Sequence, residues 1–444
     1  MKQRLSLFVG VLSMVGHALP AQSTLSLGDA ARLAAKQSGG VDVARQRVAQ
    51  AEARVTQRRG ALFPDLAAGI QQAERNFNSA TFGFTFVNPV NGKPLLRPDG
   101  EIIGPVPTVD LRYRLQQPLL DLGNVAKWRA AQSSVLAASA DVQAQADMAA
   151  ATAATVYVRA ARADAQLASR RADSALAADL LRIARDQLQA GTGIALDVTR
   201  AESQLANVRA QIISARNERD RGLLELKRAV GLPLDVPLTL SDSLAGMPVG
   251  DVPPDAATAL ARATESRADV KALLAQETAQ RSASDAIKWE RTPQLGLVVD
   301  QGVIGKNWNR LLPTYTWGVQ LSVGLFDGFR REGRLQEQVA ATRETDVKLR
   351  ELRAQSALEV RAALLDLSAA LEQVDAVRER LALAEQEVSQ AQERFRAGVA
   401  GNGDVITALL SLNQARTLRN DALASYHWAR VALAKAMGEV QTLP

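Results

Sequence analysis

Residues 115–123 read Leu-Gln-Gln-Pro-Leu-Leu-Asp-Leu-Gly and separate two kinds of sequence. Just before and within this stretch, apolar positions alternate with polar ones: Leu111, Tyr113 and Leu115 against Arg112, Arg114 and Gln116. Such a period of two predicts a β-strand with one apolar and one polar face. After Pro118, no proline occurs until Pro233. Because proline breaks helix interiors, this second part can form one very long helix. The stretch is therefore interpreted as a strand-to-helix junction.

Long helices dominate the expected secondary structure. Proline is absent from residues 21–63, 119–232, 255–292 and 314–443, which are rich in Ala, Leu, Arg, Gln and Glu. A helix of about 65–70 residues would extend for about 100 Å, far beyond an ordinary globular helix. One of these intervals also carries an apolar residue at every seventh position: Val360, Leu367, Val374, Leu381, Val388 and Phe395. This repeat predicts supercoiled packing in a bundle, a coiled coil or a helical barrel.

Other short segments share the strand pattern. Leu295, Leu297 and Val299 alternate with polar or small residues, as do Trp317, Val319, Leu321 and Val323. Aromatic residues concentrate in 61–118 and 289–329. An apolar outer face, a polar inner face and flanking aromatics are typical of transmembrane β-barrels, although a soluble hairpin packed on helices would give a similar pattern. In a barrel, the side chains expected to face the lumen are Arg112, Arg114, Gln116 and Gln320.

The chain is expected to be an internal duplication. Leu119-Leu120-Asp121 corresponds to Leu325-Phe326-Asp327, and Asp197 to Asp404, at nearly the same spacing. The first repeat, 22–247, is predicted to have strands near 65–76 and 108–118 and helices at 27–61, 122–190 and 194–231. The second, 248–444, is predicted to have strands near 293–303 and 314–326 and helices at 254–290, 329–397 and 402–438. A loop rich in proline and glycine is expected within 78–107.

The first 21 residues are interpreted as a secretory signal peptide. Lys2 and Arg4 precede an apolar run, and small residues offer cleavage after Ala18 or Ala21. The later sequence lacks an apolar run long enough to predict a transmembrane helix. A chain with four strands cannot close a barrel, because small barrels need about eight. Strands in a membrane would therefore require oligomerisation, and three copies would supply twelve strands.

Composition argues against several classes of function. The chain has no cysteine, and its two histidines are His17, in the signal, and His427, which is expected to be a packing or surface residue. No phosphate-binding loop, catalytic triad or metal-ligand cluster is recognised, so we expect neither enzymatic activity nor a cofactor or bound metal. The net charge of +6 comes from interspersed basic and acidic residues. Nucleic acid is therefore not expected as a partner.

The architecture resembles the TolC family of outer-membrane efflux proteins from about residue 25 to residue 440. Residues 115–123 resemble the family's strand-to-helix junction, and Gly324 in residues 321–328 stands where the family commonly has proline. Residues 394–398 with 403–405 resemble its helical hairpin tip, and residues 187–191 with 196–198 form the paralogous tip. The junction residues are Gln117, Pro118, Asp121, Gly123, Gly324, Asp327 and Gly328.

The resemblance implies a homotrimer in the outer membrane of a Gram-negative-type cell, with a twelve-stranded β-barrel continued by a twelve-helix periplasmic tunnel. It implies an efflux or type I secretion duct for small molecules or proteins, in contact with outer-membrane lipid and coupled through a periplasmic adaptor to an inner-membrane transporter. The expected adaptor-docking tips are Gly191, Thr192, Gly193, Gly398, Val399, Gly401 and Gly403, and the expected lumen constriction involves Asp404, Thr407 and Asp197. The alternative is a soluble periplasmic coiled-coil scaffold or adaptor.

Overall fold

The computed structural model describes residues 23–250 and 254–444. The expected signal peptide, 1–21, with His17 and both candidate cleavage sites, lies outside the described residues. The first half contains β1 (Ser23–Leu25), α1 (Leu27–Gln37), α2 (Gly39–Gly60), β2 (Asp65–Asn78), the 3-10 helix η1 (Ser79–Phe82), β3 (Ile102–Leu120), α3 (Leu122–Gln189), α4 (Ala195–Val230) and β4 (Leu238–Leu240). The second half contains α5 (Ala256–Ser266), α6 (Ala268–Trp289), β5 (Gln294–Gly305), β6 (Leu312–Ser322), α7 (Arg330–Arg396), α8 (Asn402–Met437) and the 3-10 helix η2 (Val440–Thr442).

The chain forms two compact units, and neither is one of the two expected repeats. Unit 1 consists of the described residues up to Ala44, with Val142–Val270 and Leu352–Pro444. Unit 2 consists of Arg45–Asp141 and Lys271–Glu351. Each unit therefore combines elements from both halves of the chain. Both halves nevertheless share one order: two short helices, two strands, then two long helices.

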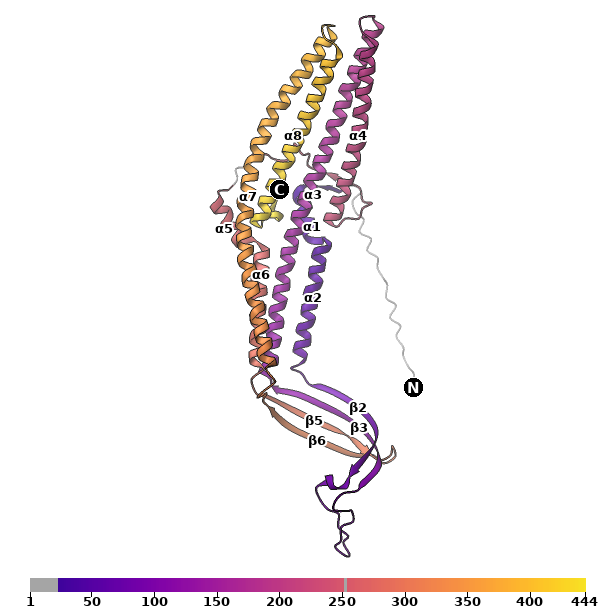
Figure 1. Ribbon diagram of the computed structural model, residues 1–444, viewed down its shortest axis with the longest axis vertical. Helices are drawn as coiled ribbons and strands as arrows, with labels where there is room; N and C mark the ends of the chain where they lie inside the picture. The colour runs from indigo at the N-terminus through magenta and orange to yellow at the C-terminus, as the bar shows by residue number, and fades with distance from the viewer. Residues whose placement is uncertain (1–22, 251–253) are drawn as a thin grey trace, which may run out of the picture. The chain divides into compact units, whose positions relative to one another are not determined.

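Unit 1 contains two helical hairpins, formed by α4 with the part of α3 from Val142 and by α8 with the part of α7 from Leu352; α1 and α5 pack beside them (Figure 1). Their contacts are built largely from alanine, including Ala150, Ala153 and Ala154 of α3, which are fully buried. Such small residues allow the helix axes to approach closely. The heptad positions of α7 from Val360 to Phe395 are buried or half-buried, as their spacing predicts. Burial of each valine or leucine contributes about 1.5–3 kcal/mol.

Unit 2 contains one antiparallel sheet in the order β2-β3-β5-β6 (Figure 1). The register pairs Arg114 with Asp300 and Val299 with Trp317. Since directly opposed residues in an antiparallel pair lie on the same face, the register fixes which side chains share a face. Strands β2 and β6 form the two edges of the sheet.

Two helices expected to be continuous are each divided, so the predictions of single helices at 27–61 and 254–290 are wrong. The first is interrupted at Ser38, whose extended backbone (ψ 146°) separates α1 from α2 and precedes two glycines. The second is interrupted at Arg267, where α5 ends and α6 begins one residue later. Buried Arg267 donates to Asp269 and Glu359 through its guanidinium group, and this tertiary requirement overrides helix propensity.

Two strand limits also differ from expectation. Strand β6 ends at Ser322, so the strand expected to reach residue 326 is shorter, because its partner β5 begins only at Gln294. Strand β3 begins at Ile102, inside the segment expected to be a loop at 78–107. Residues of β3 before Val109 pair only with β2, and such an edge tolerates proline.

Candidate functional site

The first hairpin tip, between α3 and α4, is a tight turn built on glycine. Gly191 has a φ of +76°, in the left-handed region that glycine adopts without strain. The backbone N–H groups of Thr192 and Gly193 donate to the carbonyl of Gln187 at 3.0 and 2.9 Å. These bonds satisfy a carbonyl that the end of α3 would otherwise leave unpaired.

The second tip, between α7 and α8, repeats this arrangement. Gly398 has a φ of +72°, and the Val399 N–H donates to the Arg394 carbonyl at 3.1 Å. Gly401 is the residue before the first turn of α8, and Gly403 lies within that turn. The tips also expose apolar side chains to solvent: Ile194, Leu196 and Val399.

Direct hydrogen bonds join the two tips, which lie more than 200 residues apart in sequence. The Asn402 side-chain amide donates to the Asp197 carbonyl at 2.7 Å. The Gln187 side-chain amide donates to the Phe395 carbonyl at 2.9 Å. Asn402 is fully buried, and its side-chain oxygen has no partner among the described residues. No sequence motif indicated these links.

The two acids expected to face a lumen have different environments. The Asp404 side chain is 60% exposed, and its carboxylate lies 3.9 Å from a guanidinium nitrogen of Arg394. The Asp197 side chain is only 12% exposed and lies 4.0 Å from Arg200. The Thr407 hydroxyl donates to the Gly403 carbonyl at 3.0 Å. Asp404 is therefore the acid available to solvent in one protomer, whereas Asp197 is largely covered.

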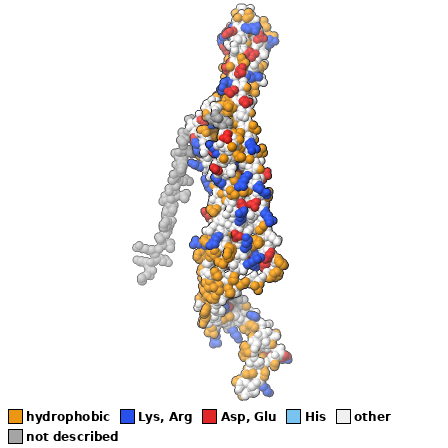
Figure 2. Space-filling model, turned by 90° about the vertical axis from the view of Figure 1, so that its left-hand side faces the viewer, with side chains coloured by type: hydrophobic (Ala, Val, Ile, Leu, Met, Phe, Trp, Pro, Cys, Tyr) orange, Lys and Arg blue, Asp and Glu red, His pale blue; other side chains and the backbone are white. Residues whose placement is uncertain are grey.

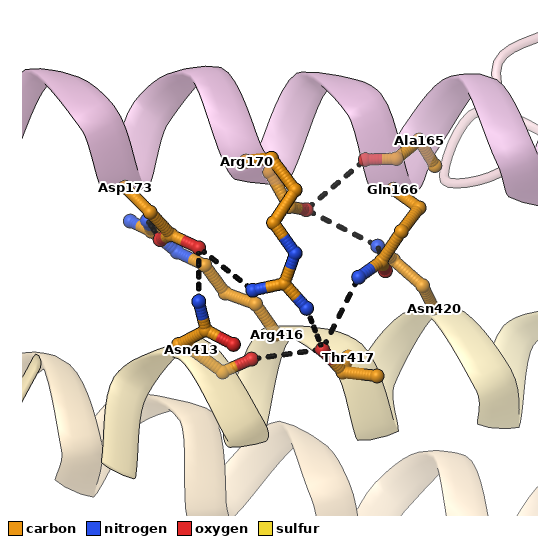
Figure 3. A network of polar contacts seen from close by, with 9 residues as sticks. Ala165, Gln166, Arg170, Asp173, Asn413, Arg416, Thr417 and Asn420 are labelled. Carbon is orange, nitrogen blue, oxygen red and sulfur yellow. Dashed lines mark hydrogen bonds and ion pairs between the residues drawn. The ribbon is translucent and has the colours of Figure 1, made fainter. Parts of the chain in front are cut away.

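A buried polar network between α3 and α8 was not indicated by the sequence (Figure 3). Asp173 of α3 accepts from Arg416 at 2.6 Å and from Asn413 at 2.9 Å, both on α8. Arg170 of α3 donates to Asp173 at 3.2 Å and to the Thr417 hydroxyl at 2.8 Å. Figure 3 shows these side chains pointing toward one another between the two helices. In the sequence, Arg170 and Asp173 look like an ordinary surface pair at i,i+3 spacing.

On the sheet, the four side chains expected to face the barrel lumen share one face. The register opposes Arg112 to Gly302, Arg114 to Asp300, Gln116 to Val298 and Gln320 to Gly296, all on the same side of β5. Asp300 accepts from Arg112 at 2.8 Å and from Arg114 at 2.9 Å. The opposite face carries exposed apolar side chains, among them Leu66, Ile70, Trp317, Val319 and Leu321.

At the first strand–helix junction, the sheet passes into α3 through a capped turn. The Asp121 carboxylate accepts from the Asn124 N–H at 2.8 Å, which caps the first turn of α3. Gln117 donates to the Leu62 carbonyl at 3.2 Å, and the strand pairing shifts at Pro118. Any side chain added at Gly123 would lie against the end of α6.

At the second strand–helix junction, an aspartate carboxylate again accepts from a backbone N–H at the start of the following helix. The Asp327 carboxylate accepts from the Arg331 N–H at 3.1 Å, at the start of α7. Gly328 has a φ of +71°. Gly324 follows the end of β6, and its carbonyl lies 3.5 Å from an Arg331 guanidinium nitrogen. The matching roles of Asp121 and Asp327 support the alignment of the two halves.

His427 is a buried packing residue of α8. Its ring lies 5.4 Å from that of Tyr426, and neither ring nitrogen forms a hydrogen bond of good geometry with the described residues. Burial, assisted by the charge of Arg430, lowers the pKa of His427 to about 4, and the Leu244 backbone acts weakly in the opposite direction. Within residues 23–250 and 254–444, no group of His, Cys, Asp and Glu is arranged to hold a metal ion. Among the helices described, none is both long and apolar enough to cross a membrane.

Comparison with known proteins agrees with this geometry. The outer membrane efflux protein family matches residues 30–232 and 259–439. The alkaline protease secretion protein AprF of Pseudomonas aeruginosa is 24% identical over 332 residues, which is 71% of this chain and 67% of AprF.

Solved channels have the same fold at low sequence identity. The Campylobacter jejuni outer membrane channel CmeC superimposes with a TM-score of 0.74 and 18% identity, over 94% of this chain and 87% of CmeC. The outer membrane protein VceC of Vibrio cholerae gives a TM-score of 0.70 and 19% identity, over 93% of this chain and 96% of VceC. These matches confirm the resemblance to TolC-like channels and the mainly helical fold with a few strands. The family match covers both halves of the chain, which therefore belongs to the outer membrane efflux protein family.

Proposed function

We propose that three copies of this outer-membrane efflux channel protein form a closed duct. The observation that carries the proposal is the four-stranded sheet, which has an exposed apolar face and two edge strands, β2 and β6. Unpaired strand edges are not viable in lipid, so each edge must pair with a neighbouring copy. Three sheets of four strands would close a barrel of twelve, and the long helices would continue the duct into the periplasm.

Passage through this duct needs no catalytic group, and the family and fold are those of transport channels. Selectivity for the cargo would depend on the electrostatic field of the charged and polar groups on the inner face and on the width of the pore. We assign Arg112, Arg114, Gln116 and Gln320 to the barrel lumen. The exposed carboxylate of Asp404 would form a ring of three in the trimer, with Thr407 one turn further along α8.

The hairpin tips are proposed to dock a periplasmic adaptor that couples the duct to an inner-membrane transporter. Each tip places glycine beside exposed apolar side chains, which permits close approach by a partner helix. Bonds between the tips, such as that from Asn402 to the Asp197 carbonyl, hold the two hairpin ends together as one surface. The cargo, small molecules or proteins, would pass between the three sets of tips.

The mass and conductance of the detergent-extracted mature protein test the duct directly. Light scattering should give a trimer, and addition to planar lipid bilayers should produce discrete ion-conducting steps. A water-soluble monomer or dimeric rod without conductance would overturn the duct and favour a periplasmic scaffold. As a matched control, protein that has been heat-denatured before addition should give no discrete steps.

A further inference from the structure

A cavity of about 560 Å³ lies among α2, α3, α6 and α7 of unit 2, near the ends of these helices that join the sheet. It belongs neither to the hairpin tips nor to the polar face of the strands. Its charged and polar lining includes Arg54, Arg58, Lys127, Ser134, Glu290 and Arg334. Four cationic side chains therefore surround a single carboxylate.

Two of these cations share that carboxylate, whose single negative charge balances only one of them. Glu290 pairs with Lys127 at 2.9 Å through one oxygen and with Arg334 at 2.5 Å through the other. Arg54 and Arg58 form no ion pair with any residue in the described part of the chain. The cavity thus carries an excess of positive charge that the protomer itself does not balance.

Arg54 and Arg58 lie four residues apart on α2, and like charges at this spacing destabilise a helix. Arg58 and Arg59 both occupy the last turn of α2, where a cation is favoured by the helix dipole. That explanation does not extend to Arg54, which lies a full turn earlier. Both side chains are exposed and line the cavity, so both guanidinium groups are available to an anion there.

The cavity lies at the level where a membrane interface is expected. Large apolar side chains flank the strand–helix junctions and are exposed: Phe63, Leu120, Trp289, Phe326 and Phe329. Figure 2 shows hydrophobic side chains gathered over this end of the helices. Aromatic girdles of this kind mark the boundary of the apolar band in membrane barrels. Arg58 lies in the last turn of α2, which ends at Gly60, and Phe63 follows three residues after that end, so the cavity lies next to this apolar band.

We propose that this cavity binds the phosphate headgroup of an anionic phospholipid in the periplasmic leaflet of the outer membrane. The guanidinium groups of Arg54 and Arg58 would each donate paired hydrogen bonds to phosphate oxygens. The Ser134 hydroxyl lines the same cavity but already donates to the Ala130 carbonyl at 3.1 Å, so the two guanidinium groups would supply the contacts to the phosphate. The acyl chains would extend toward the exposed aromatic side chains at the junctions. The inference rests on the membrane location of the strands and is independent of Asp404 and of adaptor docking.

The test uses the full mature protein in nanodiscs of phosphatidylcholine, with or without phosphatidylglycerol. Native mass spectrometry after gentle release measures how much phosphatidylglycerol remains bound. The test variant is Arg54→Gln with Arg58→Gln. The control is Arg59→Gln, which removes a neighbouring charge from the same last turn of α2, but whose guanidinium lies over the Phe63 ring rather than in the cavity.

Wild type and the Arg59→Gln control should retain phosphatidylglycerol, and the double variant should retain at least about tenfold less, because two charge-assisted contacts are lost. Equal retention by all three proteins would overturn the proposal. A parallel arm adds inorganic phosphate to the nanodiscs that contain phosphatidylglycerol. If phosphate alone displaces bound phosphatidylglycerol at low concentration, the site is one for free anions and the lipid assignment fails. A protein that does not enter nanodiscs would instead contradict the membrane duct itself.

Discussion

Asp173 of α3 and Arg416 of α8 form a buried ion pair, with 2.6 Å between the Asp173 Oδ1 and Arg416 Nη1 atoms. The Asp173 side chain is 8% exposed and also accepts from Arg170 and Asn413. A carboxylate this deeply buried keeps its charge only if cations and donors compensate the lost hydration. The pair therefore ties a helix of the first half of the chain to a helix of the second.

Asp173→Ala should lower the stability of the protein, because it leaves two guanidinium groups short of a partner. Loss of one member of a buried pair costs about 3–5 kcal/mol, and the partial exposure of Arg416 places this variant near the lower limit. The midpoint of thermal unfolding in detergent measures the effect. Asp375→Ala is the matched control, since it removes an exposed pair with Arg378 that contributes about 0–1 kcal/mol. Equal midpoints for the two variants would contradict the structural role of the network.

His427 should make stability depend on pH in the acid range. Its pKa is lowered from 6.5 to about 4 by burial, so the folded protein resists a proton that the unfolded chain accepts. The stability that neutral His427 contributes is fully present above pH 6.5 and is lost as the pH falls toward 4. The free energy of unfolding should decrease by about 3 kcal/mol in total over this range. His427→Phe should flatten this part of the pH profile of the unfolding midpoint. An unchanged difference between pH 7 and pH 4.5 in the variant would show that other groups cause the dependence.

Regular features of the fold could be predicted because they depend on periodicity along the chain. Burial at Val360, Leu367 and Phe395 follows from the seven-residue repeat, which places these positions on one side of a helix. The shared face of Arg112 and Arg114 follows from the period of two. In both cases the backbone geometry of the helix or strand fixes the direction of the side chain, and this direction does not depend on which other element packs against that face.

Features that depend on a distant partner could not be predicted in this way. The helix break at Arg267 exists because Glu359, 92 residues later, accepts from its buried guanidinium. Asp197 and Asp404 occupy equivalent sequence positions, yet only Asp404 is well exposed. Sequence similarity between the repeats predicts a turn in each hairpin, but it does not predict which of the two acids is covered by neighbouring residues. We therefore expect Asp404, rather than Asp197, to present its carboxylate at a lumen constriction.

The exposed apolar tip gives a prediction about docking. Val399→Glu places a charge on a side chain that is exposed at the α7–α8 turn, so folding and trimer mass should not change. If the tip contacts an adaptor through apolar surface, burying this charge should weaken the contact by at least about tenfold. Crosslinking to the adaptor and export from cells measure the effect. The control is Leu383→Glu, at an exposed position within α7 and away from the tip. Equal export by both variants would contradict tip docking.

Asp404 should set the charge selectivity of the channel. Its carboxylate is open to solvent, and a threefold axis would bring three copies to one level of the pore. Cations would be concentrated there and anions repelled, an effect of about two- to fivefold for exposed charges in water. In lipid bilayers, Asp404→Asn should reduce the preference for potassium over chloride by this factor, most clearly at low salt, where screening is weak. Asp197→Asn is the matched control, because the covered carboxylate of Asp197 cannot act on passing ions in the same way. A change in selectivity in the Asp197 variant alone would move the constriction to α4 and would assign Asp404 only to the start of α8.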